Sequence, residues 1–293
     1  MDLLIDNPGL LVSAVIRAAS VGCALLAAGM VLVNTLWLDT DALIASRSPR
    51  TIVSTCLIAT VALTADWINT AKQLYGEASS AFDPLVLESV LATPPGQFYT
   101  VALVGLVWVF LFTLGARTLP YLAVPGAIAV IGSIGLLGHT LSEPRWLLYG
   151  LLSLHLGLVA LWMGVLLPLS RLTRQPRNRG HAADLAEDIG RWGFAILPLI
   201  LLAGGLLGWL LLGKPTSVPT TDYASLLQIK LLLFVALVAI GAVNRFAIVP
   251  RLHDSLAAGT WLRATLWLEG LLFAAILITI SATTQNFHPM PLH

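Results

Sequence analysis

Long apolar runs separated by short polar connections dominate the chain. Runs of about 18 or more residues with few charges are typical of membrane-spanning helices, because lipid offers backbone N–H and C=O groups no hydrogen-bond partners. Eight such runs are present, and they predict an all-α bundle of eight transmembrane helices. We place them, to within about 2–4 residues, at residues 10–36, 51–71, 98–117, 121–142, 147–169, 191–213, 225–247 and 261–283.

Two connections between these runs are long enough to hold structure of their own. The connection at residues 170–190 is basic and then acidic, and it predicts a short helix from His181 to Ile189. The connection at residues 72–97 contains FDPLVLESVLA, which is typical of a short amphipathic helix lying on the membrane surface. No soluble domain is expected, so residues 1–293 are interpreted as a single integral-membrane domain.

Composition strengthens this interpretation. Hydrophobic residues make up 57% of the chain, charged residues make up 11%, and the mean hydropathy is +0.87. A lipid bilayer is therefore the expected surrounding, and the net charge of +1 gives no reason to expect a nucleic-acid partner. The start, MDLLIDNPGLL, is acidic and lacks the pattern of a cleavable signal peptide, so the first helix is expected to remain in the mature protein.

Positive charges are distributed unequally over the two faces of the predicted bundle. Short cytoplasmic loops collect Lys and Arg, and one set of loops, which includes residues 170–190, holds eleven arginines. The opposite set holds only Lys72, Arg145, Lys214 and Lys230, together with seven acidic residues. Both termini are therefore expected to face outward, and an even number of helices requires that the two ends agree.

This orientation gathers candidate metal ligands on the outer half: His139, His155, His288, Met290 and His293. Imidazole suits copper in either oxidation state and thioether suits Cu(I), so the set points to a copper ion as cargo. Two simpler interpretations stay open, since the tail NFHPMPLH fits a disordered terminus and His139 fits an interfacial residue bonded to a carbonyl. His155 is the stronger candidate, because a histidine inside a span must find a partner.

Below His155 on the same helix, Trp162 and Met163 either line an inward path or pack in the core, and core packing is the favoured interpretation. Cys23 and Cys56 lie inside the first two helices, where core packing is again expected.

Three charged residues fall within predicted spans: Arg17, Asp66 and Glu269. Arg17 and Asp66 lie at similar depth, so a structural ion pair is favoured over a proton or metal relay. Glu269 lies near mid-membrane without a cation at its depth, because Lys230 should be more than two turns closer to the outside. Glu269 is therefore expected to be protonated or to contact a substrate.

Several of these segments resemble a known family. LHLGLVALWMGVLLPL, from Leu154 to Leu169, resembles the signature helix of the CopD copper-resistance family. KLLLFVALVAIGAVNRFAIVPRL, from Lys230 to Leu252, is similar to that family's segment running from a Lys through Asn-Arg to a Pro. GHT, at residues 138–140, fits its Gly-His at the end of the preceding helix.

The resemblance implies a bacterial inner-membrane protein that passes copper, as Cu(I) or Cu(II), from the periplasm toward the cytoplasm, with a periplasmic carrier of the CopC type as possible partner. The tail would then capture copper, and His139 and His155 would be fixed stations below it. No catalytic constellation is recognisable, so an enzyme is not expected. The alternatives are a haem-b electron-transfer protein with His axial ligands and a copper enzyme or assembly factor that holds metal without moving it. The depth offset between His139 and His155, roughly 7 Å, disfavours one haem between them.

Overall fold

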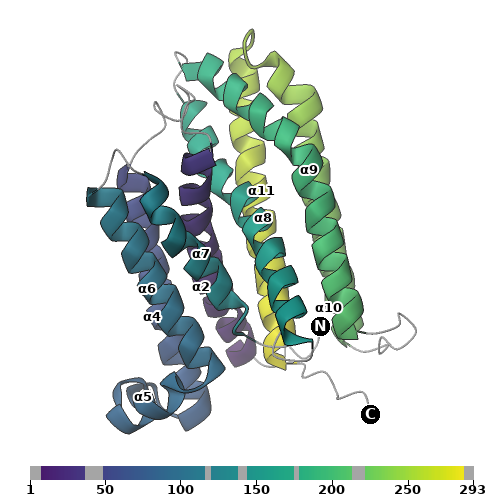
Figure 1. The fold of residues 1–293 in the computed structure, drawn as a ribbon. Helices are drawn as coiled ribbons and strands as arrows, with labels where there is room; N and C mark the ends of the chain where they lie inside the picture. The colour runs from purple at the N-terminus through teal and green to yellow at the C-terminus, as the bar shows by residue number, and fades with distance from the viewer. Residues whose placement is uncertain are drawn as a thin grey trace.

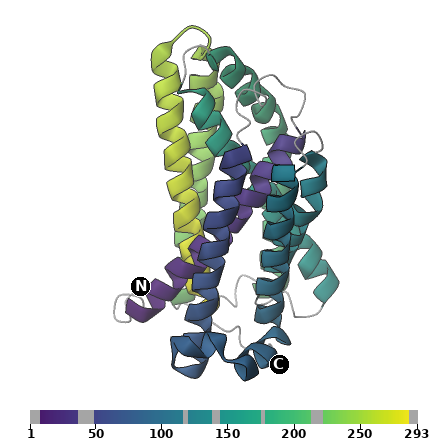
Figure 2. The same cartoon turned by 90° about the vertical axis from the view of Figure 1, so that its left-hand side faces the viewer.

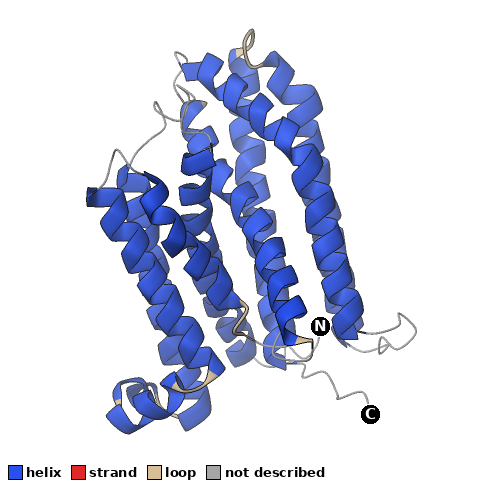
Figure 3. Ribbon diagram, in the orientation of Figure 1, coloured by secondary structure: helices blue, strands red, loops and turns tan. Residues whose placement is uncertain are grey.

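The structure, a computed structural model, describes residues 8–36, 49–115, 120–137, 144–174, 178–212 and 222–286. These residues form helices joined by short turns, with no strand among them, as Figure 3 shows. Seven of the helices are long and apolar enough to cross a membrane, and one further apolar helix is shorter. The chain is thus an all-α membrane protein, as the pattern of apolar runs predicts.

The long helices follow one another along the chain with few intervening elements. They are α2 (Pro8–Leu36), α4 (Pro49–Tyr75), α6 (Pro94–Gly115), α8 (Arg145–Leu172), α9 (Arg179–Leu212), α10 (Asp222–Val243) and α11 (Leu256–Asn286). The shorter helices are η1 (Ala78–Phe82), α5 (Pro84–Leu91), η2 (Pro120–Ala123), α7 (Val124–Ile134), η6 (Asn244–Ile248) and η7 (Val249–Arg251).

The helices form two neighbouring groups that share α2 as a central element. On one side α4, α6 and α7 stand together, on the other α9, α10 and α11, with α2 and α8 between them (Figure 1). Seen from the side, α2 crosses the bundle obliquely, and η1 and α5 close the end where α4 finishes and α6 begins (Figure 2). At this same end α2 begins and α11 finishes (Figure 1).

The two groups meet most closely where α2 crosses α8. Gly29 and Gly164 face each other there, and a Cβ on Gly29 would lie 1.8 Å from the carbonyl oxygen of Ala160. Only residues without a side chain allow two backbones to approach this closely, a device that membrane helices use where lipid gives no hydrophobic driving force. The crossing fixes the depth of α8, and hence of His155, relative to α2.

Two predicted elements differ from the observed ones. Of the span predicted at residues 121–142, the structure describes residues 121–137, and these hold η2 and the 11-residue α7, which has Pro125 in its first turn and is followed by a turn at Gly135. The separate helix predicted from His181 to Ile189 is wrong as an isolated element: it is the first part of α9, which runs across the end of the bundle before it turns down along α8 (Figure 1). No proline separates the two parts, since Pro198 lies further along.

Candidate functional site

His155 lies on α8 against the neighbouring helix α9. Its Nδ1 is 3.0 Å from the backbone carbonyl oxygen of Ile200. A carbonyl oxygen only accepts, so Nδ1 carries the proton and donates it to this bond. Nε2 is then the unprotonated nitrogen with its lone pair available. Histidines that bind metals are commonly oriented in this way, with the second ring nitrogen bonded to a carbonyl or carboxylate.

Gly204 makes room for this imidazole. A Cβ at residue 204 would lie 2.9 Å from Cε1 and 3.0 Å from Nδ1 of His155. The next residue, Gly205, faces open space, with nothing within 4 Å of a Cβ placed there. The imidazole is therefore held by its hydrogen bond to Ile200 and fits only because residue 204 has no side chain. Gly205 plays no part in making this room.

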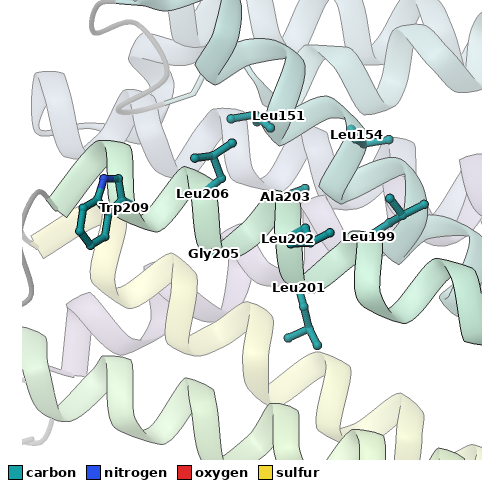
Figure 4. Close-up of a pocket in the computed structure, with 9 residues that line it drawn as sticks. All are labelled: Leu151, Leu154, Leu199, Leu201, Leu202, Ala203, Gly205, Leu206 and Trp209. Atoms are coloured by element: carbon teal, nitrogen blue, oxygen red, sulfur yellow. The ribbon is translucent and has the colours of Figure 1, made fainter.

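An apolar groove of about 520 Å³ lies beside His155 on the surface shared by α8 and α9 (Figure 4). All of its walls are apolar, and they include Leu151, Leu154, Leu199, Leu202, Leu206 and Trp209. Such a surface offers a metal ion no ligand. Candidate chemistry is therefore sought among the polar residues inside the bundle.

The other predicted ligands, His139, His288, Met290 and His293, lie outside the described residues. Within the described ranges, no group of three or more His, Cys, Asp or Glu side chains could together hold a metal ion. His155 is accordingly the one predicted ligand whose surroundings the structure describes, and the completion of a metal site by His139 or by the tail stays a prediction.

A second polar group joins three helices deeper in the bundle. Glu269 of α11 accepts hydrogen bonds from Trp162 of α8, with Nε1 2.9 Å from Oε2, and from Asn244 of η6, with Nδ2 2.7 Å from Oε1. The ring of Trp162 also packs edge-on against Phe273, with ring centroids 5.6 Å apart. Trp162 therefore combines packing with a polar contact that was not predicted from the sequence.

Asn244 stands at a change of helix type. The α-helix α10 ends at Val243, and η6, from Asn244 to Ile248, has π-helical hydrogen bonding. Single-turn π-helical segments occur frequently at functional sites. The side chain of Asn244 is fixed at both ends, because Thr265 Oγ1 donates to its Oδ1 at 2.5 Å while its Nδ2 donates to Glu269. The Asn-Arg pair in the segment from Lys230 to Leu252 was part of the family resemblance and so pointed to Asn244. The contact of Asn244 with Glu269 is seen only in the folded structure.

The ion pair predicted between Arg17 and Asp66 is present. Arg17 Nε lies 2.6 Å from Asp66 Oδ2, and the Asp66 side chain is fully buried. The same oxygen accepts from Ser20 Oγ at 3.1 Å and from Tyr99 OH at 3.0 Å. Tyr99 also accepts from Arg17 Nη2 at 3.1 Å. This network joins α2, α4 and α6 and pairs the two opposite charges.

Met163 is 8% exposed and belongs to the main apolar core, together with Met30 and Cys56. Cys23 packs against the same core. Core packing, the favoured interpretation of both cysteines and of Met163, therefore describes their surroundings.

Comparison with known proteins agrees with the family resemblance. Residues 185–283 match the family "Copper resistance protein D" (CopD), which covers most of α9 and all of α10 together with much of α11. The segment from Lys230 to Leu252 lies inside this match, whereas the segment from Leu154 to Leu169 precedes it. The similarity to the CopD family predicted from the quoted motifs is thus confirmed, and the matched region includes both Asn244 and Glu269.

The chain also matches a curated inner membrane protein. The chain is 33% identical over 140 residues to the inner membrane protein YebZ of Escherichia coli (strain K12). This match covers 46% of the present chain and 48% of the relative, so it spans about half the length of that protein. No solved structure matches the chain.

Proposed function

We propose that this protein takes up copper at the outer face of a bacterial inner membrane and passes it toward the cytoplasm without chemical conversion of any substrate. The observation that carries the proposal is the imidazole of His155, whose Nδ1–H is bonded to Ile200 so that Nε2 is free to bind a metal ion. The match to a copper-resistance family supplies the identity of that ion.

The orientation proposed here places both termini in the periplasm. Its support is the excess of arginine on the loops of the opposite face. His288, Met290 and His293 would then capture the metal, and His139 would assist His155. A small periplasmic copper carrier of the CopC type is the proposed donor.

A transfer station must bind its cargo weakly enough to release it. Among the described residues His155 supplies a single metal ligand. A site with few ligands fits passage of copper better than storage.

Copper binding by purified protein in detergent tests the proposal directly. Wild type is expected to bind copper stoichiometrically without a Soret band, and His155→Ala is expected to lose most of this binding. A reducible Soret band that disappears in His155→Ala would contradict the proposal and indicate a membrane cytochrome instead.

A pair of glycine variants separates a metal site from a damaged fold. Gly204→Ala places a methyl group against the imidazole, so copper affinity should fall by about tenfold or more, the range seen when the residue orienting a metal ligand is lost. Gly205→Ala adds the same methyl group to open space on the same helix and should leave the affinity unchanged. Equal effects of the two variants would show that His155 is not held for metal binding.

A further inference from the structure

Arg245 is a half-buried cation that no acidic side chain pairs with. It lies on η6, next to Asn244, where η6 contacts α9. In the part of the chain that the structure describes, no Asp or Glu lies within ion-pair distance of its guanidinium group. Its Nε is buried and is without a hydrogen-bond partner among the same residues. The charge of Arg245 is therefore uncompensated within the described helices.

The side chain of Arg245 lies on the backbone of α9 at Gly190. A Cβ added to Gly190 would be 2.5 Å from Cδ, 2.7 Å from Nε and 3.0 Å from Cζ of Arg245. A side chain that only extended into water would need no gap in a neighbouring helix. Because residue 190 has no side chain, the guanidinium group is held between η6 and α9 instead.

Other arginines at this end of the bundle have partners within the chain. They are Arg171 with the hydroxyl of Thr51, Arg191 with the carboxylate of Asp188, and Arg251 with the carbonyl oxygen of Ala247. A charge without a partner is costly where water is scarce. Arg245 consequently offers its donors to a group from outside the chain.

Arg245 lies at the depth of lipid headgroups. It is two residues before the end of the span predicted at residues 225–247, and Gly190 is one residue before the span predicted at residues 191–213. Trp192, two residues after Gly190, is 59% exposed, and tryptophan is enriched at the boundary between membrane and water. The phosphate groups of lipids lie at this boundary, within reach of the guanidinium group.

An apolar surface lies beside Arg245. The rings of Phe194 and Phe246 pack against each other, with centroids 6.3 Å apart, and the two side chains are 63% and 68% exposed. Phe246 directly follows Arg245, and Phe194 lies about one helical turn after Gly190. A cation beside exposed aromatic rings fits a molecule that has both an anionic head and an apolar part.

We propose that Arg245, held between η6 and α9, binds the phosphate of an anionic phospholipid whose acyl chains lie against Phe194 and Phe246. A guanidinium group can donate two parallel hydrogen bonds to a phosphate, which an ammonium group does not. Basic sites between membrane helices bind anionic lipid headgroups. Free phosphate fits the guanidinium group but makes no use of the aromatic pair. The inference goes beyond the proposed copper function and does not depend on it.

Native mass spectrometry of the full-length protein in detergent tests this site. Phosphatidylglycerol is the probe, and phosphatidylcholine with the same acyl chains is the comparison. Wild type should prefer phosphatidylglycerol, and Arg245→Gln should lower its affinity by about tenfold, the size expected when a hydrogen bond to a charged group is lost. Arg174→Gln, which removes an exposed arginine at the same end of the bundle, should change the affinity far less. Arg245→Lys keeps the charge without the planar fork and should lie between wild type and Arg245→Gln.

Two glycines of α9 provide a second, independent test. Gly190→Ala places a methyl group in the space that the Arg245 side chain occupies, so it should weaken phosphatidylglycerol binding as Arg245→Gln does. Gly193→Ala adds a methyl group where nothing lies within 4 Å and should leave the binding unchanged.

Two results would overturn the inference. An equal loss of phosphatidylglycerol binding in Arg245→Gln and Arg174→Gln would show that only the total charge of this end matters. Displacement of the lipid by excess inorganic phosphate would indicate a site for a free anion rather than for a lipid. Unfolding midpoints close to that of wild type in lipid-free detergent would show that lost binding does not come from misfolding. If Arg245→Gln does not fold, Arg245→Lys and the two glycine variants decide the question.

Discussion

Two buried carboxylates, Asp66 and Glu269, have different kinds of partner inside the bundle. Asp66 lies in the half of the bundle built from α2, α4 and α6, and it is neutralised by Arg17 at 2.6 Å. Glu269 lies among α8, α10 and α11, and among the described residues it has neutral partners alone. Both are almost inaccessible to solvent, with exposures of 0% and 3%. The charge of the first carboxylate is compensated by a cation, whereas the second is held by neutral hydrogen-bond donors.

This difference gives the two groups of helices different electrostatics. The Asp66 network ties three helices together through a charged pair, so removal of a member should cost stability. The Glu269 network ties α8, η6 and α11 together through neutral hydrogen-bond donors. The close crossing of Gly29 and Gly164 connects the two groups, so α8 is held with both His155 and Trp162 in place.

The largest loss of stability is expected when the charge of Asp66 is removed. Asp66→Asn leaves Arg17 without its counter-ion inside the bundle, and loss of one partner of a buried pair costs about 3–5 kcal/mol. We therefore expect a large drop in the thermal unfolding midpoint in detergent, with poor yield of folded protein.

A double variant is the control for Asp66→Asn. Replacing both members, with Arg17→Leu and Asp66→Leu, removes the unpaired charge and should recover much of the lost stability, because apolar replacements of buried pairs are often neutral. If the double variant were as unstable as the single one, packing and hydrogen bonds rather than charge would hold this region together.

A smaller loss of stability is expected when one hydrogen bond to Asp66 is removed. Tyr99→Phe removes a hydroxyl that donates to Asp66 at 3.0 Å but leaves the ring against Trp67. A hydrogen bond to a charged group contributes about 1.5–3 kcal/mol, so the variant should lose about that much in unfolding free energy. Tyr121→Phe removes an equivalent hydroxyl from a side chain that is 52% exposed and should have no measurable effect. Equal stability of the two variants would mean that Asp66 does not depend on Tyr99.

The ion pair and the isolation of Glu269 were predictable from the sequence for a simple reason. Apolar runs fix the depth of each residue, and depth alone shows that Arg17 can reach Asp66 and that Lys230 cannot reach Glu269. The same reasoning predicted the all-α class and eight spans, of which seven correspond to long helices, six of them to within five residues at each end. The prediction failed at α7, which local turns make shorter than a span. It also failed at α9, where residues expected to form a separate loop helix continue into the span as one helix.

Depth says nothing about which way a helix faces. Trp162 and Glu269 are 107 residues apart, and their hydrogen bond depends on the rotation of α8 and α11 about their own axes. The contact of Gly204 with His155 likewise requires knowledge of which face of α9 meets α8. These rotations follow from packing across the whole bundle, so neither contact was apparent from spacing along the chain.

The smallest loss of stability is expected for Glu269→Gln, the counterpart of Asp66→Asn. If Glu269 is protonated in the absence of metal, Glu269→Gln replaces one neutral group with another of the same shape and loses a single acceptor, at a cost of about 1 kcal/mol. Glu269→Ala should cost more, because it leaves the donors of both Trp162 and Asn244 unpaired. Thermal unfolding of the three proteins without metal measures this order. A loss for Glu269→Gln as large as that for Asp66→Asn would show that Glu269 is a compensated anion, and that the two carboxylates are not different in kind.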